Sequence, residues 1–558
     1  GTVTKRGTGN FNVFFSSSGL PLNNAGTLTV EAGAMDITTP STHTGNFNVL
    51  AGGRLEFRSN AAATGHSFGP ASQLNGAGIY EFSTGTHTIA RDQSNSATFN
   101  FTGGSTSSTS FAGSAAVNAV NISGGMPVTF NGTTTLGSGS MVNGQMLGSG
   151  NVTINGTFTQ TSGTMGGTGI TTLANGGVIN HAAGTLTLSR TLVNNGTYNF
   201  NGTGNLTLTN GTFNNAGAFV ADSASTLQMF GGFSNPAAVN AFNNSGTLTK
   251  RGTGLFQSFL SNSIVPVNNT GSVVVEAGTL ELRSTGSHTG SFNVASGARL
   301  EFGSNVNTTG HTFSPASTLT GSGTFEFSTG THNYPGVISN AAALLFSGGS
   351  TSNATIGGNV AANSLSFTNG SVGTFNGTSV TAVNATFING TFTGPANLLL
   401  SGIVNIGTGA LTGSGTVTLA NTSQLNLTSG TFSLGRALTQ NGSTLHTGGS
   451  FAFLAGQFFN NGTFTSQSDS TLQYFGNSAN PVTPNEFFNN GTFIKRGTGT
   501  SQFIISSSIA SFINNGNVLI QEGTLNLDTP ATHTGDFNIA SDALMIVGSN
   551  AAATGNTF

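Results

Sequence analysis

Histidines are the residues of this chain that could most readily hold a metal ion or act as a general base. Most of the nine recur at fixed spacing along the chain. The recurring sets are His43, His288 and His533, then His87 and His332, and then His66 and His311, which are matched by Asn556. No second histidine or carboxylate stands at the spacing that metal ligands need. We therefore expect no metal site, and instead polar corners that hydrogen-bond to a neighbouring turn of the chain.

A Lys-Arg-Gly-Thr-Gly segment is the one doubly charged motif present three times, at residues 5–9, 250–254 and 495–499. It does not fit a phosphate-binding loop, because the Walker pattern is absent and no helix is expected to follow. Its charges could pair with Glu31 or Glu276 of an adjacent turn of the chain, or with a neighbouring protomer. The favoured interpretation is an exposed turn whose charges discourage aggregation through strand edges.

Clustered carboxylates are the chemistry of sugar-cleaving enzymes, which need an acid and a base, or a calcium site with basic residues nearby. The 16 acidic residues are scattered as single residues, such as Glu56, Glu81, Asp92 and Asp222. Several are replaced at corresponding positions of the chain, Glu31 and Glu276 by Gln521, and Glu56 and Glu301 by Ile546. We therefore predict no catalytic, cofactor-binding or metal-binding residues, and a protein that is not an enzyme.

Asn-Gly-Thr occurs repeatedly and fits the acceptor sequence for N-glycosylation. Examples are Asn131, Asn155, Asn201, Asn210, Asn376, Asn389 and Asn461. Asn-Gly is also a favoured tight turn, which accounts for its frequency without any sugar. The sequence leaves both interpretations open.

A long internal repeat organises the chain. The Lys-Arg-Gly-Thr-Gly segment returns every 245 residues, from Lys5 to Lys250 and from Lys250 to Lys495. The register slips by one residue within the repeat, where Arg190 matches Arg436, and then recovers. The predicted units of one continuous solenoid are residues 1–245, residues 246–490 and a partial third unit at 491–558.

Short strands separated by glycine and asparagine make up each unit. Apolar and polar residues alternate over 26–37, 271–282 and 516–527, as they do on half-buried strands. Corners follow an apolar-Asn-Asn pattern, for example at 22–24 and 242–244. No window shows helical spacing, and Thr, Val and Phe dominate the strands. The sequence predicts an all-β parallel β-helix, or β-solenoid, that is right-handed, has about 22–27 coils and contains no significant helix.

Two other repeated β architectures fit the sequence less well. A β-propeller also repeats its blades, but a 245-residue superperiod with irregular sub-repeats suits an open rod better than a closed ring. A tandem of immunoglobulin-like domains is disfavoured because the chain has no tryptophan and no tyrosine-corner pattern.

The amino-acid composition limits the classes of binding partner and the cellular location that we expect for the protein. Charged residues make up 5% of the chain, and the formal net charge is −3, so no basic patch is expected to bind nucleic acid. No apolar run approaches the length of a membrane-spanning segment, so we expect no membrane insertion. The chain has no cysteine, which excludes disulfides and thiolate sites. A surface of Thr, Ser, Asn and Gly is typical of extracellular β proteins, and we predict a secreted protein at the cell surface.

The strand repeats resemble those of a known group of bacterial proteins. A Gly-Thr-Leu-x-Val-x-x-Gly-x-Leu-x-Leu pattern recurs at 26–37, 271–282 and 516–527, and Gly45–Val49 and Arg54–Phe57 follow the same style. The chain thereby resembles the β-strand repeats of autotransporter passengers and giant surface adhesins. The resemblance implies a parallel β-helix displayed outside the cell, and it brings no catalytic residues with it.

Two functional hypotheses follow, and both make the protein a passive structural element. In the first, it is a segment of an extracellular filament, fibre or sheath made of end-to-end solenoids. In the second, it is the stalk of a cell-surface adhesin. Because Gly1 and Phe558 both fall inside repeat motifs, we expect a longer parent chain or head-to-tail polymerisation. The expected partners are copies of the protein itself, head to tail or side by side, with cell-surface polysaccharide as a further candidate. A polysaccharide-active β-helix enzyme is the third and least favoured hypothesis.

Overall fold

The computed structural model describes residues 1–13, 20–59, 64–232, 240–259, 265–304, 309–350, 352–477, 485–504, 506, 508–549 and 555–558. These residues form an all-β solenoid of about 24 turns in which parallel strands stack coil upon coil, as the sequence predicted. No helix occurs among them, and therefore none that could cross a membrane. The chain divides into two compact units, Gly1–Gly286 and Ser287–Phe558.

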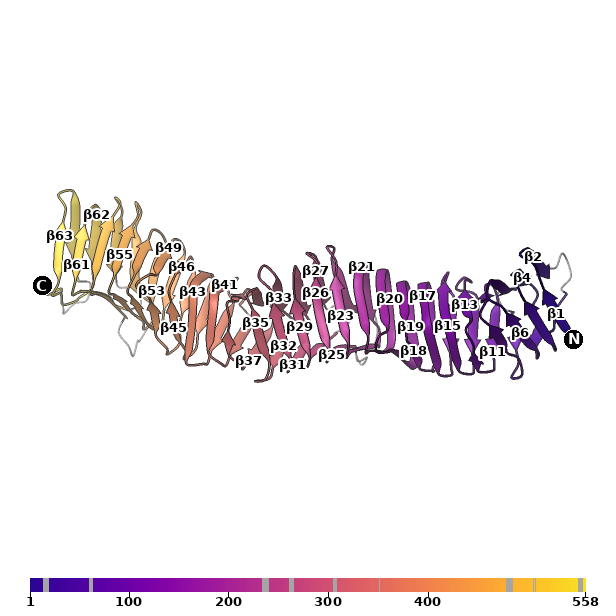
Figure 1. Ribbon diagram of the computed structural model, residues 1–558. Helices are drawn as coiled ribbons and strands as arrows, with labels where there is room; N and C mark the ends of the chain where they lie inside the picture. The colour runs from indigo at the N-terminus through magenta and orange to yellow at the C-terminus, as the bar shows by residue number, and fades with distance from the viewer. Residues whose placement is uncertain are drawn as a thin grey trace. The chain divides into compact units, whose positions relative to one another are not determined.

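Each regular coil contributes three short strands, so that a strand pairs in parallel with the strand three places further along the chain (Figure 1). The early coils of the first unit show the pattern. They contain β3 (Thr27–Val30), β4 (Gly33–Ile37) and β5 (Thr42–His43), then β6 (Asn46–Val49), β7 (Gly53–Phe57) and β8 (Ser67–Phe68), then β9 (Leu74–Gly76), β10 (Ile79–Phe82) and β11 (Thr86–Ile89). The pairs β4–β7 and β7–β10 place Asp36, Glu56 and Glu81 in one row.

The other strands that carry the candidate site follow the same plan. In the first unit they are β1 (Thr2–Lys5), β2 (Asn10–Val13), β19 (Thr157–Leu173), β20 (Val178–Asn194), β22 (Thr212–Asn215), β25 (Ala241–Asn244), β26 (Thr247–Arg251) and β28 (Val267–Asn269). In the second unit they are β33 (Arg299–Phe302), β36 (Thr324–Phe327), β43 (Ser379–Ile388), β44 (Gly390–Thr393), β47 (Gly409–Leu411), β50 (Thr431–Leu434), β54 (Gln457–Asn460), β57 (Asn485–Asn489), β58 (Thr492–Arg496), β60 (Ala510–Asn514) and β64 (Ala543–Val547).

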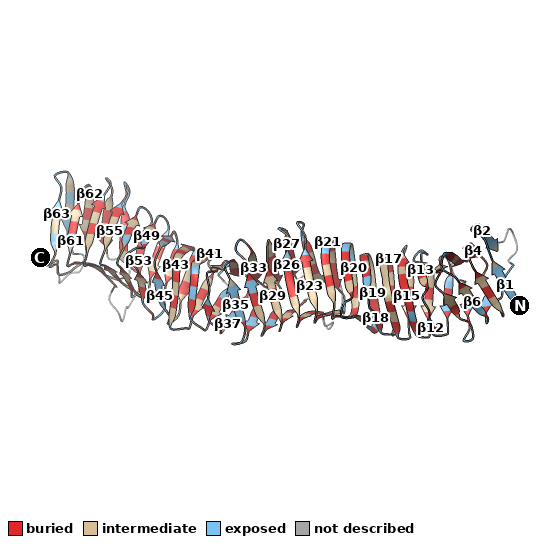
Figure 2. Ribbon diagram, viewed as in Figure 1, coloured by how far each residue is buried: buried red, intermediate tan, exposed pale blue. Residues whose placement is uncertain are grey.

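Alternation of side chains along each strand builds the core. In β3, Leu28 and Val30 are buried while Thr27 and Thr29 face outward, and Figure 2 shows the same alternation of buried and less buried positions along the strands. Period-2 alternation directs every second side chain inward, so each coil adds a layer of apolar residues to a narrow interior.

Phenylalanine stacks dominate that interior. In the second unit Phe458, Phe487 and Phe512 follow one another on β54, β57 and β60, with ring centroids 4.9 Å and then 5.4 Å apart. These stacks stabilise the core by more than burial alone, because stacked rings attract one another beyond the hydrophobic effect. Like residues at like positions therefore stabilise neighbouring coils.

One glycine position recurs at the same corner of every repeat. Gly33, Gly278 and Gly523 are equivalent residues, with φ angles of 71°, 66° and 72°. Residues other than glycine rarely adopt these angles. A Cβ atom at Gly278 would also lie 2.5 Å from the carbonyl oxygen of Gly254, so the next coil could not approach so closely.

Candidate functional site

Arg54 gathers three carboxylates from three successive coils. Its guanidinium lies 3.1 Å from Asp36 Oδ1, 3.0 Å from Glu56 Oε2 and 2.7 Å from Glu81 Oε2. These residues stand on β4, β7 and β10, where the parallel register brings equivalent outward positions together. The prediction that Glu56 and Glu81 are isolated is wrong, because coils of unequal length hide their alignment in the sequence.

The carboxylate oxygens of this row already have protein partners. Ser83 Oγ donates to Glu56 Oε1 at 2.7 Å, and Thr102 Oγ1 donates to Glu81 Oε1 at 3.0 Å. Burial, and then the charge of Glu56, raise the pKa of Asp36. Burial lowers the pKa of Arg54, but hydrogen bonds to Glu81 and Glu56 outweigh it and leave the pKa above its usual value. Arginine and hydroxyl donors therefore hold the carboxylates of this row in place.

The second unit repeats this arrangement on β33 and β36. Arg299 lies 2.7 Å from Glu301 Oε2 and 2.5 Å from Glu326 Oε2. Ser328 Oγ donates to Glu301 Oε1 at 2.7 Å, as Ser83 does to Glu56. An Arg-x-Glu pair on one strand, repeated 245 residues later, was the sequence signal that could have revealed the ladder.

The Lys-Arg-Gly-Thr-Gly turns separate the two charges of the motif. Lys250 and Lys495 are buried, and Lys250 Nζ donates to the carbonyl oxygens of Arg251 and, at 2.7 Å, Gly252. Lys495 Nζ donates to the carbonyls of Arg496 and Gly497 at 2.7 and 2.6 Å. Burial lowers the pKa of both lysines.

In the second and third copies, where the lysine is buried, only the arginine fits the expected exposed charge. Arg251 Nε lies 2.8 Å from Glu276, and Arg6 Nε lies 3.2 Å from Glu31. In the third copy Arg496 donates to Gln521 at 2.7 Å, so a neutral amide replaces the carboxylate. Pairing between coils, which the sequence analysis had treated as the less favoured interpretation, is thus present. The lysine was wrongly placed at the surface, because its alkyl chain and three donors suit an interior of backbone carbonyls.

Arg190 and Arg436 are buried and bind main-chain carbonyls of earlier coils. Arg190 donates from Nε to Gly169 at 2.7 Å, from Nη1 to Gly166 at 3.2 Å and from Nη2 to Gly150 at 2.8 Å. Arg436 donates to the carbonyl oxygens of Gly394, Ala396 and Thr412, and its guanidinium carbon lies 5.0 Å from the centre of the Phe392 ring. Burial lowers the pKa of Arg436 to about 10. The sequence indicated only that these arginines correspond.

The histidines lie in the interior and not at polar corners. His43, His87, His288 and His332 are buried among phenylalanines, although they do hydrogen-bond to neighbouring coils as expected. Burial, and then neighbouring histidines, lower the pKa of His43 and of His87 to about 3. No group of three or more potential metal-ligating side chains occurs among the described residues.

Asparagine ladders run through the interior of both units. In the first, Asn194, Asn215, Asn244 and Asn269 follow one another, with amide-to-amide hydrogen bonds of 2.6, 2.7 and 2.7 Å. Each donor amide also reaches a carbonyl, for example Asn215 Nδ2 to Thr247 at 3.0 Å. The sequence analysis placed asparagines at these corners, but it did not predict that the second asparagine of each pair would be buried in a ladder.

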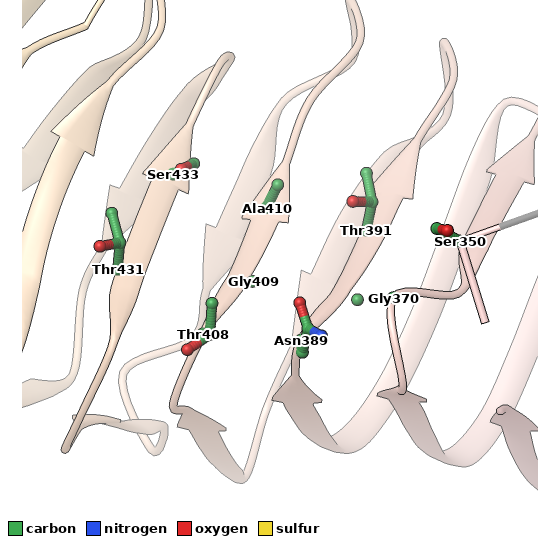
Figure 3. Close-up of a pocket in the computed structure, with 10 residues that line it drawn as sticks. Ser350, Gly370, Asn389, Thr391, Thr408, Gly409, Ala410, Thr431 and Ser433 are labelled. Carbon is green, nitrogen blue, oxygen red and sulfur yellow. The ribbon is translucent and has the colours of Figure 1, made fainter.

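The outer surface carries small polar groups. A groove of about 390 Å³ in the second unit is lined by residues of several successive coils, and Thr391, Ala410 and Ser433 of β44, β47 and β50 follow one another along it (Figure 3). Thr408 and Asn389 add a hydroxyl and an amide. This lining could hydrogen-bond to the hydroxyl groups of a saccharide.

A second groove, of about 770 Å³, flanks the third Lys-Arg turn. Asp469, Arg496, Glu522 and Asp542 line it. Asp469 Oδ1 accepts hydrogen bonds from the backbone nitrogen and the hydroxyl of Thr498, both at 3.0 Å. The backbone hydrogen bond, followed by the hydroxyl hydrogen bond, lowers the pKa of Asp469.

All asparagines of the Asn-Gly-Thr sequences are exposed at the surface, where either a turn or a glycan could explain them. These are Asn131, Asn155, Asn195, Asn201, Asn210, Asn376, Asn389, Asn461 and Asn490. Comparison of the chain with protein-family models, with curated proteins and with solved structures found no match.

Proposed function

We propose that this protein is a non-catalytic structural component of an extracellular filament, fibre or sheath built from β-solenoids that associate end to end. The observation that carries the proposal is the repetition of one hydrogen-bonding template from coil to coil. In the second unit, for example, Asn460 donates to Asn489 at 2.7 Å, and Asn489 donates to Asn514 at 2.8 Å. A coil that presents such a ladder offers the same donors, acceptors and apolar layer to the next coil.

The chemistry of the buried polar groups supports a structural role. Lys250 and Arg190 bind backbone carbonyls, and the outer carboxylates at Glu56 and Glu81 accept hydrogen bonds from arginine and hydroxyl partners. A polysaccharide-active enzyme would need an acid and a base free to reach a substrate. The partners on these carboxylates therefore favour cohesion between coils over catalysis.

End-to-end association predicts which residues become covered. Val3 and Phe11 are 49% and 50% exposed on the first coil. Their counterparts one repeat later, Leu248 and Phe256, are 2% and 1% exposed because a preceding coil packs on them. In the proposed filament a further coil, whether of the same polypeptide or of a second copy, covers Val3 and Phe11 in the same manner.

A stalk of a cell-surface adhesin is the second candidate function. The groove lined by Asn389, Thr391, Thr408 and Ser433 favours it, because hydroxyl and amide groups are suited to contact with polysaccharide. In this alternative the solenoid is a spacer, and its contacts are with sugars on a cell surface and not with other copies.

Sedimentation velocity over a range of protein concentrations tests the filament proposal against the stalk. We expect species larger than the monomer to grow with concentration, and Val3→Glu to weaken this association at least tenfold. Val383→Glu is the matched control, because Val383 is similarly exposed, at 45%, but lies within β43 of the second unit. A protein that stays monomeric at every concentration, or equal effects of both variants, would contradict the filament.

A further inference from the structure

Three histidines form a continuous ladder in each unit. In the first unit the rings of His43 and His66 stack with centroids 5.3 Å apart, and those of His66 and His87 lie 5.6 Å apart. In the second unit the centroid distances are 5.1 Å from His288 to His311 and 5.7 Å from His311 to His332. Nearly parallel rings in successive coils therefore form a three-membered ladder twice in the chain.

Backbone donors fix the tautomer of the first ladder. The backbone N–H of Asn24 donates to His43 Nδ1 at 3.3 Å, so this nitrogen must be unprotonated and Nε2 must carry the hydrogen. His43 Nε2 then donates to His66 Nδ1 at 3.1 Å, and His66 Nε2 donates to the carbonyl of Arg58 at 3.0 Å. The backbone N–H of His66 donates to His87 Nδ1 at 3.1 Å.

The same assignment holds in the second unit. His288 Nε2 lies 2.9 Å from His311 Nδ1, and the backbone N–H of His311 donates to His332 Nδ1 at 3.1 Å. His311 Nε2 and His332 Nε2 donate to the carbonyls of Gly303 and Thr329. Every Nδ1 in these contacts is thus an acceptor, and a proton on it would remove a hydrogen bond between coils.

In the described part of the chain, no carboxylate hydrogen-bonds to His43, His66 or His87 of the first ladder. In the first unit Phe47, Phe57 and Phe68 contact the ring of His43. The carboxylates on the same strands, Asp36 and Glu56, alternate to the outer face.

The pKa values agree with this environment. Burial is the largest cause that lowers the pKa of His43 and His87 to about 3, of His66 to about 4 and of His332 to about 3. Neighbouring ladder histidines lower the pKa of His43, His87 and His332 further. Hydrogen bonds to the backbone raise the pKa of His66, His87 and His332, but by less than burial lowers it.

We propose that the ladders His43–His66–His87 and His288–His311–His332 are acid-sensitive joints at which the solenoid coils separate before the rest of the fold opens. At the end rings His43, His87 and His332 a proton on Nδ1 cannot be accommodated by rotating a partner, because the donor to each of these rings is a backbone N–H of fixed direction. The protonated ring also places a charge between two stacked imidazoles. Protonation of a ladder therefore both removes a hydrogen bond between coils and places a charge beside a stacked ring.

Two other buried histidines provide an internal control. His181 Nδ1 lies 3.0 Å from Tyr198 Oη, and His446 Nδ1 lies 2.8 Å from Tyr474 Oη. A hydroxyl can reverse its role and accept a hydrogen bond from a protonated ring. Burial lowers the pKa of both histidines to about 4, so they resemble the ladder in burial but not in hydrogen bonding.

The partial third copy supplies a matched variant. Asn556 occupies the position of His66 and His311, and its Oδ1 accepts from His533 Nε2 at 3.1 Å. An amide therefore keeps the hydrogen bond of the middle histidine without its titratable nitrogen. The double substitution His66→Asn with His311→Asn reproduces this natural arrangement in both complete ladders.

Hydrogen–deuterium exchange of the full chain between pH 7 and pH 3, corrected for the intrinsic pH dependence of exchange, tests the proposal. We expect protection of peptides that contain the ladder histidines to fall at least tenfold. Peptides around His181 and His446 should lose protection only at lower pH. The double variant should shift the acid midpoint of the ladder peptides downward by at least half a pH unit.

Two outcomes would overturn the proposal. One is loss of protection around His181 or His446 at the same pH as at the ladders, because burial alone would then explain the effect. The other is an unchanged midpoint in the double variant. If that variant fails to fold, the comparison among peptides of the unsubstituted protein still decides between the two explanations.

Discussion

Lys250 and Arg190 lie inside the solenoid and direct their charged groups at main-chain carbonyl oxygens. Lys250 Nζ lies 2.7 Å from the Gly252 carbonyl, while Arg190 binds the carbonyls of Gly150, Gly166 and Gly169, which lie 21 to 40 positions earlier in the chain. Gly166 and Gly169 lie where the register of β19 with β20 shifts, so Arg190 supplies donors to carbonyls at an irregular part of the ladder. The basic residues therefore stabilise the main chain of their coils.

Replacement of the buried lysine tests this role. Lys250→Met removes the donor to two carbonyls while it keeps most of the side-chain volume. We expect the free energy of local opening around β26 to fall by about 2 kcal/mol, since buried acceptors lose a charged donor. Hydrogen exchange of β26 measures the change. The control is Arg251→Ala, which removes only an exposed ion pair and should leave exchange almost unchanged.

The three hydrogen bonds from Arg190 to backbone carbonyls predict that substitutions at this position lower the stability by different amounts. Arg190→Met should lower the stability of its coils by about 3 kcal/mol, because three carbonyls lose donors. Arg190→Lys should restore part of the loss, since an ammonium cannot reach all three acceptors as a planar fork does. The midpoint of guanidinium-induced unfolding gives the order. Equal midpoints for the two variants would show that the fork geometry is irrelevant.

Each pair of adjacent asparagines on a strand places one side chain in an inner ladder and the other in an outer ladder. We refer to these ladders as the inner and the outer column. Asn244 lies in the buried ladder, and Asn243 lies in a parallel outer ladder in which Asn243 donates to Asn214 at 2.9 Å. The two columns share chemistry and differ in burial. Because buried amides lose more when a partner is removed, the inner column should stabilise the coil more than the outer one.

Alanine substitution separates the two columns. Asn244→Ala removes one buried hydrogen bond from Asn215 and one from Asn269, and we expect a loss of about 2 kcal/mol in unfolding free energy. Asn243→Ala removes an amide that water can replace, and the loss should be below about 1 kcal/mol. Chemical denaturation compares them. An equal loss would indicate that the ladder contributes no more inside than outside.

The aromatic stacks allow a similar comparison of two substitutions, one in the core and one on the outer face. Phe487 packs between Phe458 and Phe512 in the core, and its neighbour Phe488 stacks on Phe459 on the outer face at 4.8 Å. Phe487→Ala should cost about 3–5 kcal/mol, because it opens a cavity in a continuous stack. Phe488→Ala should cost clearly less. Thermal unfolding of both variants provides the comparison, and a reversed order would contradict the assignment of the core.

For these strands the sequence predicted where the corners lie better than it predicted which side chains are buried. The apolar-Asn-Asn pattern located corners such as 242–244, and the period-2 alternation located the strands beside them. It could not show that Asn244 points inward and Asn243 outward, because both are polar residues in a local pattern. That distinction depends on which coils stack above and below, and hence on contacts 25 to 29 residues away.

The whole-molecule fold follows from features that recur along the chain. Alternation over 26–37 and 271–282, together with the absence of helical spacing, was enough to predict parallel coils. The carboxylate ladder was not predictable in the same way. Arg54 meets Asp36 across 18 residues and Glu81 across 27, so coils of unequal length conceal the alignment.

The central claim, that each coil is a template for the next and that copies associate end to end, is tested most directly by electron microscopy of the purified protein at increasing concentration. We predict unbranched fibres of the width of one solenoid that lengthen with concentration, and shorter particles for Val3→Glu. Isolated particles of constant length at every concentration would contradict the filament and favour a stalk.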